Sequence, residues 1–202
     1  MDEPNDTVGA KAALMSIGSF FWELIKVFLI AVVIIIPVRY FLVQPFFVRG
    51  ASMEPSYEDG EYLVVDELSY RWREPQRGEV IVFRYPNNPS QFFIKRIIGL
   101  PGDTVRVNDG RVVIQNDQYQ QGVVLDESGY LSAGTRTGGQ LDVRLGSDEY
   151  FVMGDNRSAS SDSRSWGPLK RFEIVGRTWI RAYPFDRFSV FEIMKPGYLS
   201  LQ

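Results

Sequence analysis

The sequence predicts a mainly β protein, in which an N-terminal single transmembrane helix precedes a β-rich domain of short antiparallel strands. Two observations carry this prediction. From residue 46 onward, short runs rich in Val, Ile, Phe and Tyr alternate with turns rich in Gly, Pro, Asn and Asp. Before them lies one long apolar run, and no further amphipathic helical pattern of about ten or more residues follows it.

We expect the membrane anchor to occupy residues 22–42. The uncharged centre of this run, residues 27–38, is shorter than the roughly 20 residues needed to cross a bilayer. Residues 22–42 are long enough to cross the bilayer if the side chains of Lys26 and Arg39 extend their charged ends toward opposite membrane interfaces. A buried core helix and a cleavable signal peptide are the alternatives. Pro37 and the β-branched run disfavour the first, and the lack of a small-residue cleavage pattern disfavours the second.

Turn signals and composition divide the rest of the chain. Asn-Asp-Gly at 108–110 predicts a hairpin. Residues 116–147 are rich in Gln, Gly, Ser and Thr, which predicts a loop-rich stretch with room for one further hairpin. The expected organisation is an N-terminal tail (1–21), the anchor (22–42), a β-rich domain (46–192) with a loop-rich insertion at about 104–147, and a C-terminal tail (193–202).

The composition excludes several kinds of chemistry. The chain has no histidine and no cysteine, which excludes a Ser-His-Asp triad, a cysteine nucleophile and metal sites built on imidazole or thiolate. A net charge of −3 gives no nucleic-acid signature, and no glycine-rich phosphate loop is present. We therefore expect no cofactor, no metal and no nucleic-acid partner. A nucleophilic serine would need a base other than histidine, and a desolvated lysine is one of the few available.

Ser52 and Lys95 are the candidates for such a pair. If residues 92–98 form a strand, Lys95 shares one face with Phe93 and Ile97, and these apolar neighbours would lower its pKa. In the non-catalytic alternative, Ser52 is an ordinary loop residue and Lys95 is a lysine on an edge strand that discourages aggregation.

A polar cluster at 154–164 directly follows the predicted strand 149–153. It contains Asp, Asn, Arg and four serines. As part of a site, it could orient a buried lysine through a serine hydroxyl and pair an aspartate with arginines. As a surface loop, it would need no special explanation.

Three stretches, taken in order, carry a resemblance to a known family. They are Ser-Met-Glu-Pro-Ser at 52–56, Lys-Arg-Ile-Ile-Gly-Leu-Pro-Gly-Asp at 95–103, and Gly-Asp-Asn-Arg through Ser-x-Asp-Ser-Arg at 154–164. They resemble the motifs of bacterial type I signal peptidases, the leader peptidase family of Ser-Lys serine proteases, from the anchor to about residue 190. The resemblance implies a membrane-bound, signal-peptidase-like catalytic domain. Such enzymes remove N-terminal signal peptides from exported preproteins after small residues at −3 and −1.

The resemblance also implies roles for individual residues. Ser52 falls on the nucleophile and Lys95 on the general base. The supporting residues are Ser160, which hydrogen-bonds the lysine, the ion pair of Asp162 and Arg164, and Arg96. The substrate-binding residues are Val48, Met53, Leu63, Phe93 and Ile94. One departure is Gly50, because some members have a serine there whose hydroxyl completes the oxyanion hole.

The implied partners are preproteins that carry signal peptides, and a lipid bilayer. The implied location is a bacterial plasma membrane or a thylakoid membrane, with the catalytic domain on the outer side. Two other functions remain open at this point. A soluble-type Ser-Lys autoprotease of the repressor class would need a helix-turn-helix or a self-cleavage loop upstream. A non-catalytic, membrane-tethered β module would make Ser52 and Lys95 incidental.

Overall fold

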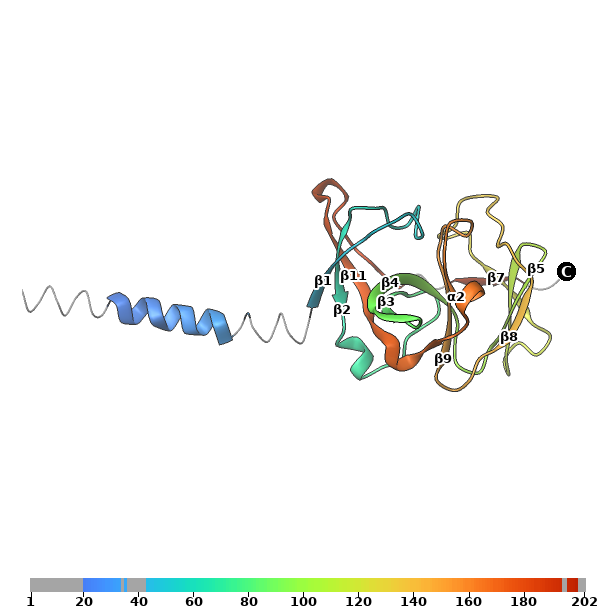
Figure 1. The fold of residues 1–202 in the computed structure, drawn as a ribbon, viewed down its shortest axis with the longest axis horizontal. Helices are drawn as coiled ribbons and strands as arrows, with labels where there is room; N and C mark the ends of the chain where they lie inside the picture. Colours follow the sequence, from blue (N-terminus) through green and yellow to red (C-terminus); the bar gives the residue numbers. More distant parts are fainter. Residues whose placement is uncertain (1–19, 34, 36–42, 194–195, 200–202) are drawn as a thin grey trace, which may run out of the picture. The chain divides into compact units, whose positions relative to one another are not determined.

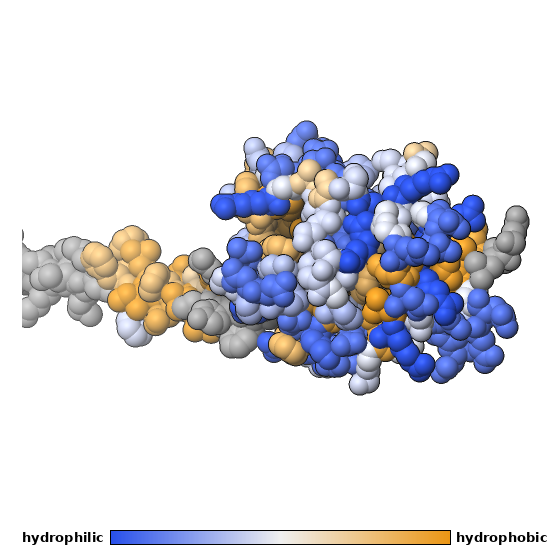
Figure 2. Space-filling view, turned by 45° about the vertical axis from the view of Figure 1, so that its right-hand side comes forward, coloured by the Kyte–Doolittle hydropathy of each residue, from blue (hydrophilic) through white to orange (hydrophobic). Residues whose placement is uncertain are grey.

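The computed structural model describes residues 20–33, 35, 43–193 and 196–199 (Figure 1). These residues belong to two compact units, one within residues 1–42 and the other within residues 43–202. In the first unit, residues 20–33 and 35 are helical, and most of the large apolar side chains are exposed (Figure 2). None of the described helices is long and apolar enough to cross a membrane. Residues 34 and 36–42 of the expected anchor lie outside the described residues, as do residues 1–19 of the expected tail.

The second unit contains two antiparallel sheets, which confirms the prediction of a mainly β protein. The first sheet has eight strands. In spatial order they are β1 (Val43–Phe47), β2 (Tyr62–Asp66), β11 (Ile174–Tyr183), β3 (Val80–Tyr85), β4 (Asn88–Gly99), β9 (Glu149–Met153) and β10 (Leu169–Lys170), with β12 (Ser189–Val190) paired to β11.

The second sheet is built around the predicted hairpin. Asp109 and Gly110 both have positive φ, at 51° and 80°, as a two-residue turn between twisted strands requires. The order of the five strands is β13 (Gly197–Leu199), β7 (Val123–Asp126), β6 (Arg111–Gln115), β5 (Thr104–Asn108) and β8 (Leu141–Arg144). Strands β7 and β8 therefore flank the hairpin instead of forming a second one, and β13 adds a strand from the expected C-terminal tail.

The described part of this unit also contains four short helical turns: η1 (Ser69–Arg71), α2 (Ser163–Trp166), η2 (Arg171–Glu173) and η3 (Phe185–Arg187). The two sheets share a core, because Ile98 of β4 and Phe151 and Met153 of β9 pack with the buried valines of β5 and β6. Strands β4 and β9 thus belong to the first sheet and also contribute to the core shared with the second sheet (Figure 1).

The junction between the sheets has no spare volume at Gly99, the last residue of β4. A methyl group on Gly99 would lie 2.5 Å from Val105 Cγ2 and 2.9 Å from Phe151 Cβ. Both distances are far below van der Waals contact, so any larger residue must shift these neighbours.

We expect Gly99→Ala to destabilise the chain by about 1–3 kcal/mol through overpacking, measured as a lower midpoint of urea unfolding. Gly138→Ala is the matched control, because nothing lies within 4 Å of its Cβ position and its φ is not positive. The control should leave stability unchanged or raise it by up to about 1 kcal/mol. Equal midpoints for Gly99→Ala and the unchanged chain would contradict the packing argument.

Candidate active site

The structure brings Ser52 and Lys95 into contact. Lys95 Nζ donates hydrogen bonds to Ser52 Oγ and to Ile94 O, each at 2.8 Å, and lies 5.4 Å from the centre of the Phe93 ring. Lys95 lies within β4, as predicted, and is only 4% exposed. A loop serine and a strand lysine 43 positions apart in the sequence therefore form one site.

Burial lowers the pKa of Lys95 to about 8, although the carboxylates of Asp162 and Asp155 favour its charged form. An amine with this pKa is neutral in an appreciable fraction of molecules near pH 7 to 8. A neutral amine at hydrogen-bond distance from a hydroxyl can accept its proton.

The loop that carries Ser52 is held on two sides. Asn156 donates from its backbone N to Ser52 O at 3.1 Å, and from Nδ2 to Ala51 O at 3.1 Å. On the other side, Gly50 N donates to Asp59 Oδ1 at 2.6 Å. Gly50 has φ of +87°, which favours glycine over any other residue. The loop conformation therefore depends on a glycine at position 50.

Gly154, at the end of β9, lies directly behind the serine. A methyl group on Gly154 would come within 2.3 Å of both Ser52 O and Ser160 Oγ. Ser160 is thus close to the pair, but its buried hydroxyl has no hydrogen-bond partner among the described residues. The implied hydrogen bond between Ser160 and Lys95 is not among those the structure contains.

Asp162 and Arg164 form the implied ion pair. The Asp162 carboxylate accepts hydrogen bonds from Arg164 Nε and Nη2, both at 2.8 Å, and from Gly154 N at 3.0 Å. Burial alone would raise the pKa of Asp162, but these hydrogen bonds and the Arg164 charge outweigh it, so the pKa lies below its usual range. Asp162 therefore remains a carboxylate and holds the end of β9.

Arg96 pairs with Asp155, a residue that the sequence analysis did not assign to the site. The guanidinium donates from Nε to Asp155 Oδ1 at 2.8 Å, from Nη2 to Oδ2 at 2.6 Å, and from Nη1 to Gly78 O at 2.8 Å. Both side chains are almost fully buried. The available signal was Asp155 itself, between Gly154 and Asn156, since an arginine on a buried strand needs a carboxylate partner.

A cavity of about 490 Å³ opens beside Ser52 and Lys95. Four of the five predicted substrate-binding residues line it: Val48, Leu63, Phe93 and Ile94. The fifth, Met53, is fully buried in a core cluster with Tyr57 and Val80 and does not line the cavity. The sequence analysis missed Val82, which faces Ile94 across β3 and β4, and also Phe46, Phe47, Arg49, Gln91, Phe92 and Ser161. The walls of this cavity, called the groove below, are largely apolar.

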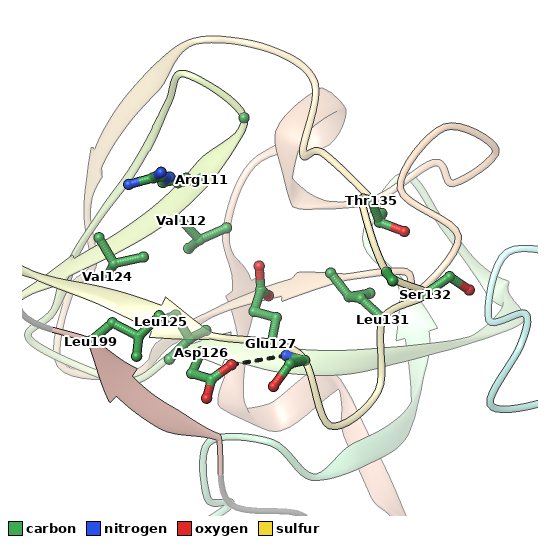
Figure 3. A pocket seen from close by; sticks show the side chains of 14 residues that line it. Arg111, Val112, Val124, Leu125, Asp126, Glu127, Leu131, Ser132, Thr135 and Leu199 are labelled. Carbon is green, nitrogen blue, oxygen red and sulfur yellow. Dashed lines mark hydrogen bonds between the residues drawn. The ribbon is translucent and has the colours of Figure 1, made fainter.

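A second cavity, of about 620 Å³, lies in the second sheet between β6, β7 and the loop that follows β7 (Figure 3). Its lining includes Val112, Leu125 and Leu131, and a hydrogen bond from Ser128 N to Asp126 Oδ1 crosses its edge. None of the predicted site residues borders it, so the groove remains the candidate site.

Comparison with known proteins gives consistent matches. Residues 21–183 match the family model described as signal peptidase, peptidase S26. The probable signal peptidase I-2 of Synechocystis sp. is 38% identical over 173 residues, covering 83% of this chain and 76% of the relative. The probable signal peptidase I-1 of the same organism is 36% identical over 180 residues, covering 83% and 87%. A crystal structure of a signal peptidase I from Enterococcus faecalis V583 is 31% identical, covering 52% of this chain and 97% of that chain, with a TM-score of 0.43.

Proposed function

The chain belongs to the signal peptidase family, peptidase S26, and from this premise we propose that it removes N-terminal signal peptides from exported preproteins, with Ser52 as nucleophile and Lys95 as general base. The observation that carries the proposal is the 2.8 Å contact between Lys95 Nζ and Ser52 Oγ at the wall of an apolar groove. Membership of this family makes the chain a serine endopeptidase and replaces the repressor-type alternative.

The proposed reaction is an acyl transfer with one base. Neutral Lys95 accepts the Ser52 proton as Oγ attacks the scissile carbonyl carbon, and the resulting ammonium gives that proton to the leaving amine. Lys95 then activates the water that hydrolyses the acyl-enzyme. Burial prepares the lysine for both roles, because it lowers the pKa of the amine to about 8.

The oxyanion of this reaction needs hydrogen-bond donors. Ser52 N–H is available, since it donates to no group in the described part of the chain. Gly50 N–H already donates to Asp59, and Gly50 has no side chain to donate. A single such donor is typically responsible for about 2.7–4 kcal/mol of transition-state stabilisation. The Ser52 N–H is therefore the principal protein donor that we assign.

The groove supports a preference for small residues at −3 and −1. A preprotein bound as an added extended strand would direct alternate side chains into the groove. The lining side chains Val48 and Leu63 are buried, and Phe93 and Ile94 are partly buried, so they leave shallow, apolar space. A methyl group fits such space at little cost, whereas a large or charged side chain must move the wall or lose its hydration.

We assign residues 22–42 to a single membrane anchor, with the catalytic unit on the outer side of a bacterial plasma membrane or a thylakoid membrane. Ser52 follows Leu42 by ten residues, so an extended chain places it within roughly 35 Å of the end of the anchor. A row of exposed aromatic side chains also crosses β1, β2, β11 and η3. This aromatic row consists of Phe47, Tyr62, Tyr183 and Phe185. Aromatic side chains of this kind favour the membrane interface.

The catalytic pair is tested by Ser52→Ala and Lys95→Arg in the full chain, with cleavage of a synthetic Ala-x-Ala precursor in detergent micelles as the measurement. We expect both variants to lose at least about 10³-fold in kcat, because a guanidinium does not deprotonate in proteins. A Lys95→Arg enzyme that retained a tenth of the normal rate would refute the assignment of the base. An active Ser52→Ala enzyme would support the non-catalytic β module instead.

The pH profile of the unchanged enzyme is a second readout of the same pair. Below a pKa of about 8, Lys95 is protonated and cannot accept the Ser52 proton, so kcat/KM should rise with pH through about 8. A profile that climbs only near the ordinary lysine pKa of about 10.4 would show that Lys95 is hydrated in solution.

A precursor series varied only at −1 tests the groove. Alanine should be cut well, whereas leucine and lysine should lower kcat/KM by at least about 100-fold, because neither side chain fits beside Phe93 and Ile94. A second series varied at +3 is the control, since we place that residue outside the groove. Equal cleavage after alanine and leucine would contradict the pocket argument.

Membrane attachment is tested with the full chain and with residues 43–202. The full chain should resist extraction by alkaline carbonate. The shorter chain should stay folded by circular dichroism, because both sheets lie within it, and should bind liposomes only weakly through the aromatic row. Tyr183→Ser with Phe185→Ser should reduce that binding further. Extraction of the full chain by carbonate would overturn the anchor.

A further inference from the structure

The loop between β7 and β8 returns from the second sheet to the back of the proposed catalytic pair. This loop spans residues 127–140, and its first part, 127–137, fell in the stretch that the composition identified only as loop-rich. Tyr130 is 6% exposed and Thr137 is 2% exposed, and the Glu127 side chain is 10% exposed. Surface loops seldom bury a carboxylate and a tyrosine together without a partner inside the protein. The partners are two arginines of the site.

The first partner is Arg157, whose side chain is 1% exposed. Its Nη1 donates to Glu127 Oε2 at 2.9 Å, and its Nη2 donates to Glu127 Oε1, so the pair is bidentate. Nη1 also donates to Thr137 Oγ1. On its other side, Arg157 Nε donates to Gly154 O at 3.1 Å. Glu127 therefore fixes the guanidinium that holds the Gly154 carbonyl, and Gly154 packs against Ser52.

The second partner is Arg96, the residue that follows Lys95 on β4. The Arg96 guanidinium carbon lies 4.1 Å from the centre of the Tyr130 ring, a cation–π contact shielded from water. Tyr130 Oη donates to Glu127 Oε1 at 2.6 Å. One carboxylate thus fixes both the ring that covers Arg96 and the guanidinium that holds Gly154.

We propose that Glu127 and Tyr130 are positioning residues for the Ser52–Lys95 pair, because their loop fixes Gly154 behind Ser52 and Arg96 beside Lys95. The inference rests on the catalytic roles proposed above. Neither residue lines the groove. Their loss should therefore lower kcat and leave KM nearly unchanged, since misplacing reacting groups by about 1 Å can cost about 100-fold in rate.

The experiment compares four variants of the full chain in detergent micelles, with kcat and KM measured on the Ala-x-Ala precursor. Glu127→Gln and Tyr130→Leu should each lower kcat by about 10- to 100-fold with KM within about threefold of normal. Tyr130→Phe keeps the ring over Arg96 but loses the hydrogen bond from Oη to Glu127, so its kcat should lie between those of Tyr130→Leu and the unchanged enzyme. Asp142→Asn is the matched control, because it removes the carboxylate of an exposed ion pair with Arg106 in the second sheet, away from Arg96 and Arg157. The control should leave kcat unchanged.

Each result decides the proposal. The proposal is overturned if a folded Glu127→Gln enzyme has a normal kcat or is impaired only in KM. It is also overturned if Asp142→Asn lowers kcat as much as Glu127→Gln does. If Glu127→Gln does not fold, the comparison of Tyr130→Leu with Tyr130→Phe decides, and equal kcat values for these two overturn it. Ser52→Ala separates the two levels of inference. If Ser52→Ala is inactive while Glu127→Gln is fully active, only the positioning role fails, whereas an active Ser52→Ala enzyme overturns the proposed function as well.

Discussion

The proposed activity depends on keeping the amine of Lys95 out of water. The next residue on the same strand, Arg96, is equally buried and cannot lose its charge. Strand β4 thus places a cation that must deprotonate beside one that never does. The structure meets both demands by different means. The amine of Lys95 lies over the Phe93 ring and donates to the Ile94 carbonyl, while Asp155 binds the Arg96 guanidinium with two hydrogen bonds.

The second sheet is part of this arrangement and does not simply extend the fold. Its core is continuous with β4 and β9, so it excludes solvent from the reverse side of the strands that carry the site. Buried charges are costly unless each is paired, and here Arg96, Arg157 and Asp162 all have partners with several hydrogen bonds. The ion pairs lie around the amine without touching it, which leaves Lys95 desolvated and its neighbours charged.

Local patterns in the sequence predicted what local physics determines. The alternation of side chains along residues 92–98 predicted that Lys95 is buried, and Asn-Asp-Gly predicted the hairpin. The absence of histidine indicated that a nucleophilic serine would need another base. Longer-range contacts were beyond such patterns. Glu127 and Arg157 are 30 positions apart in the sequence, in a stretch without hydrophobic periodicity, so nothing local marked them as a pair. Met53 was assigned to substrate binding through the family resemblance, yet its side chain is buried in the core.

The attachment of residues 127–137 to Arg157 has a practical meaning for protein engineering. Foreign peptides are tolerated where the backbone is exposed and unpaired, and not where a loop is fastened inside the protein. Directly after Thr137, Gly138 and Gly139 have open space around them. An epitope or fluorescent reporter spliced between these two glycines would leave the fastened segment intact. The same insertion placed between Glu127 and Thr137 would separate these two residues and break their contacts with Arg157.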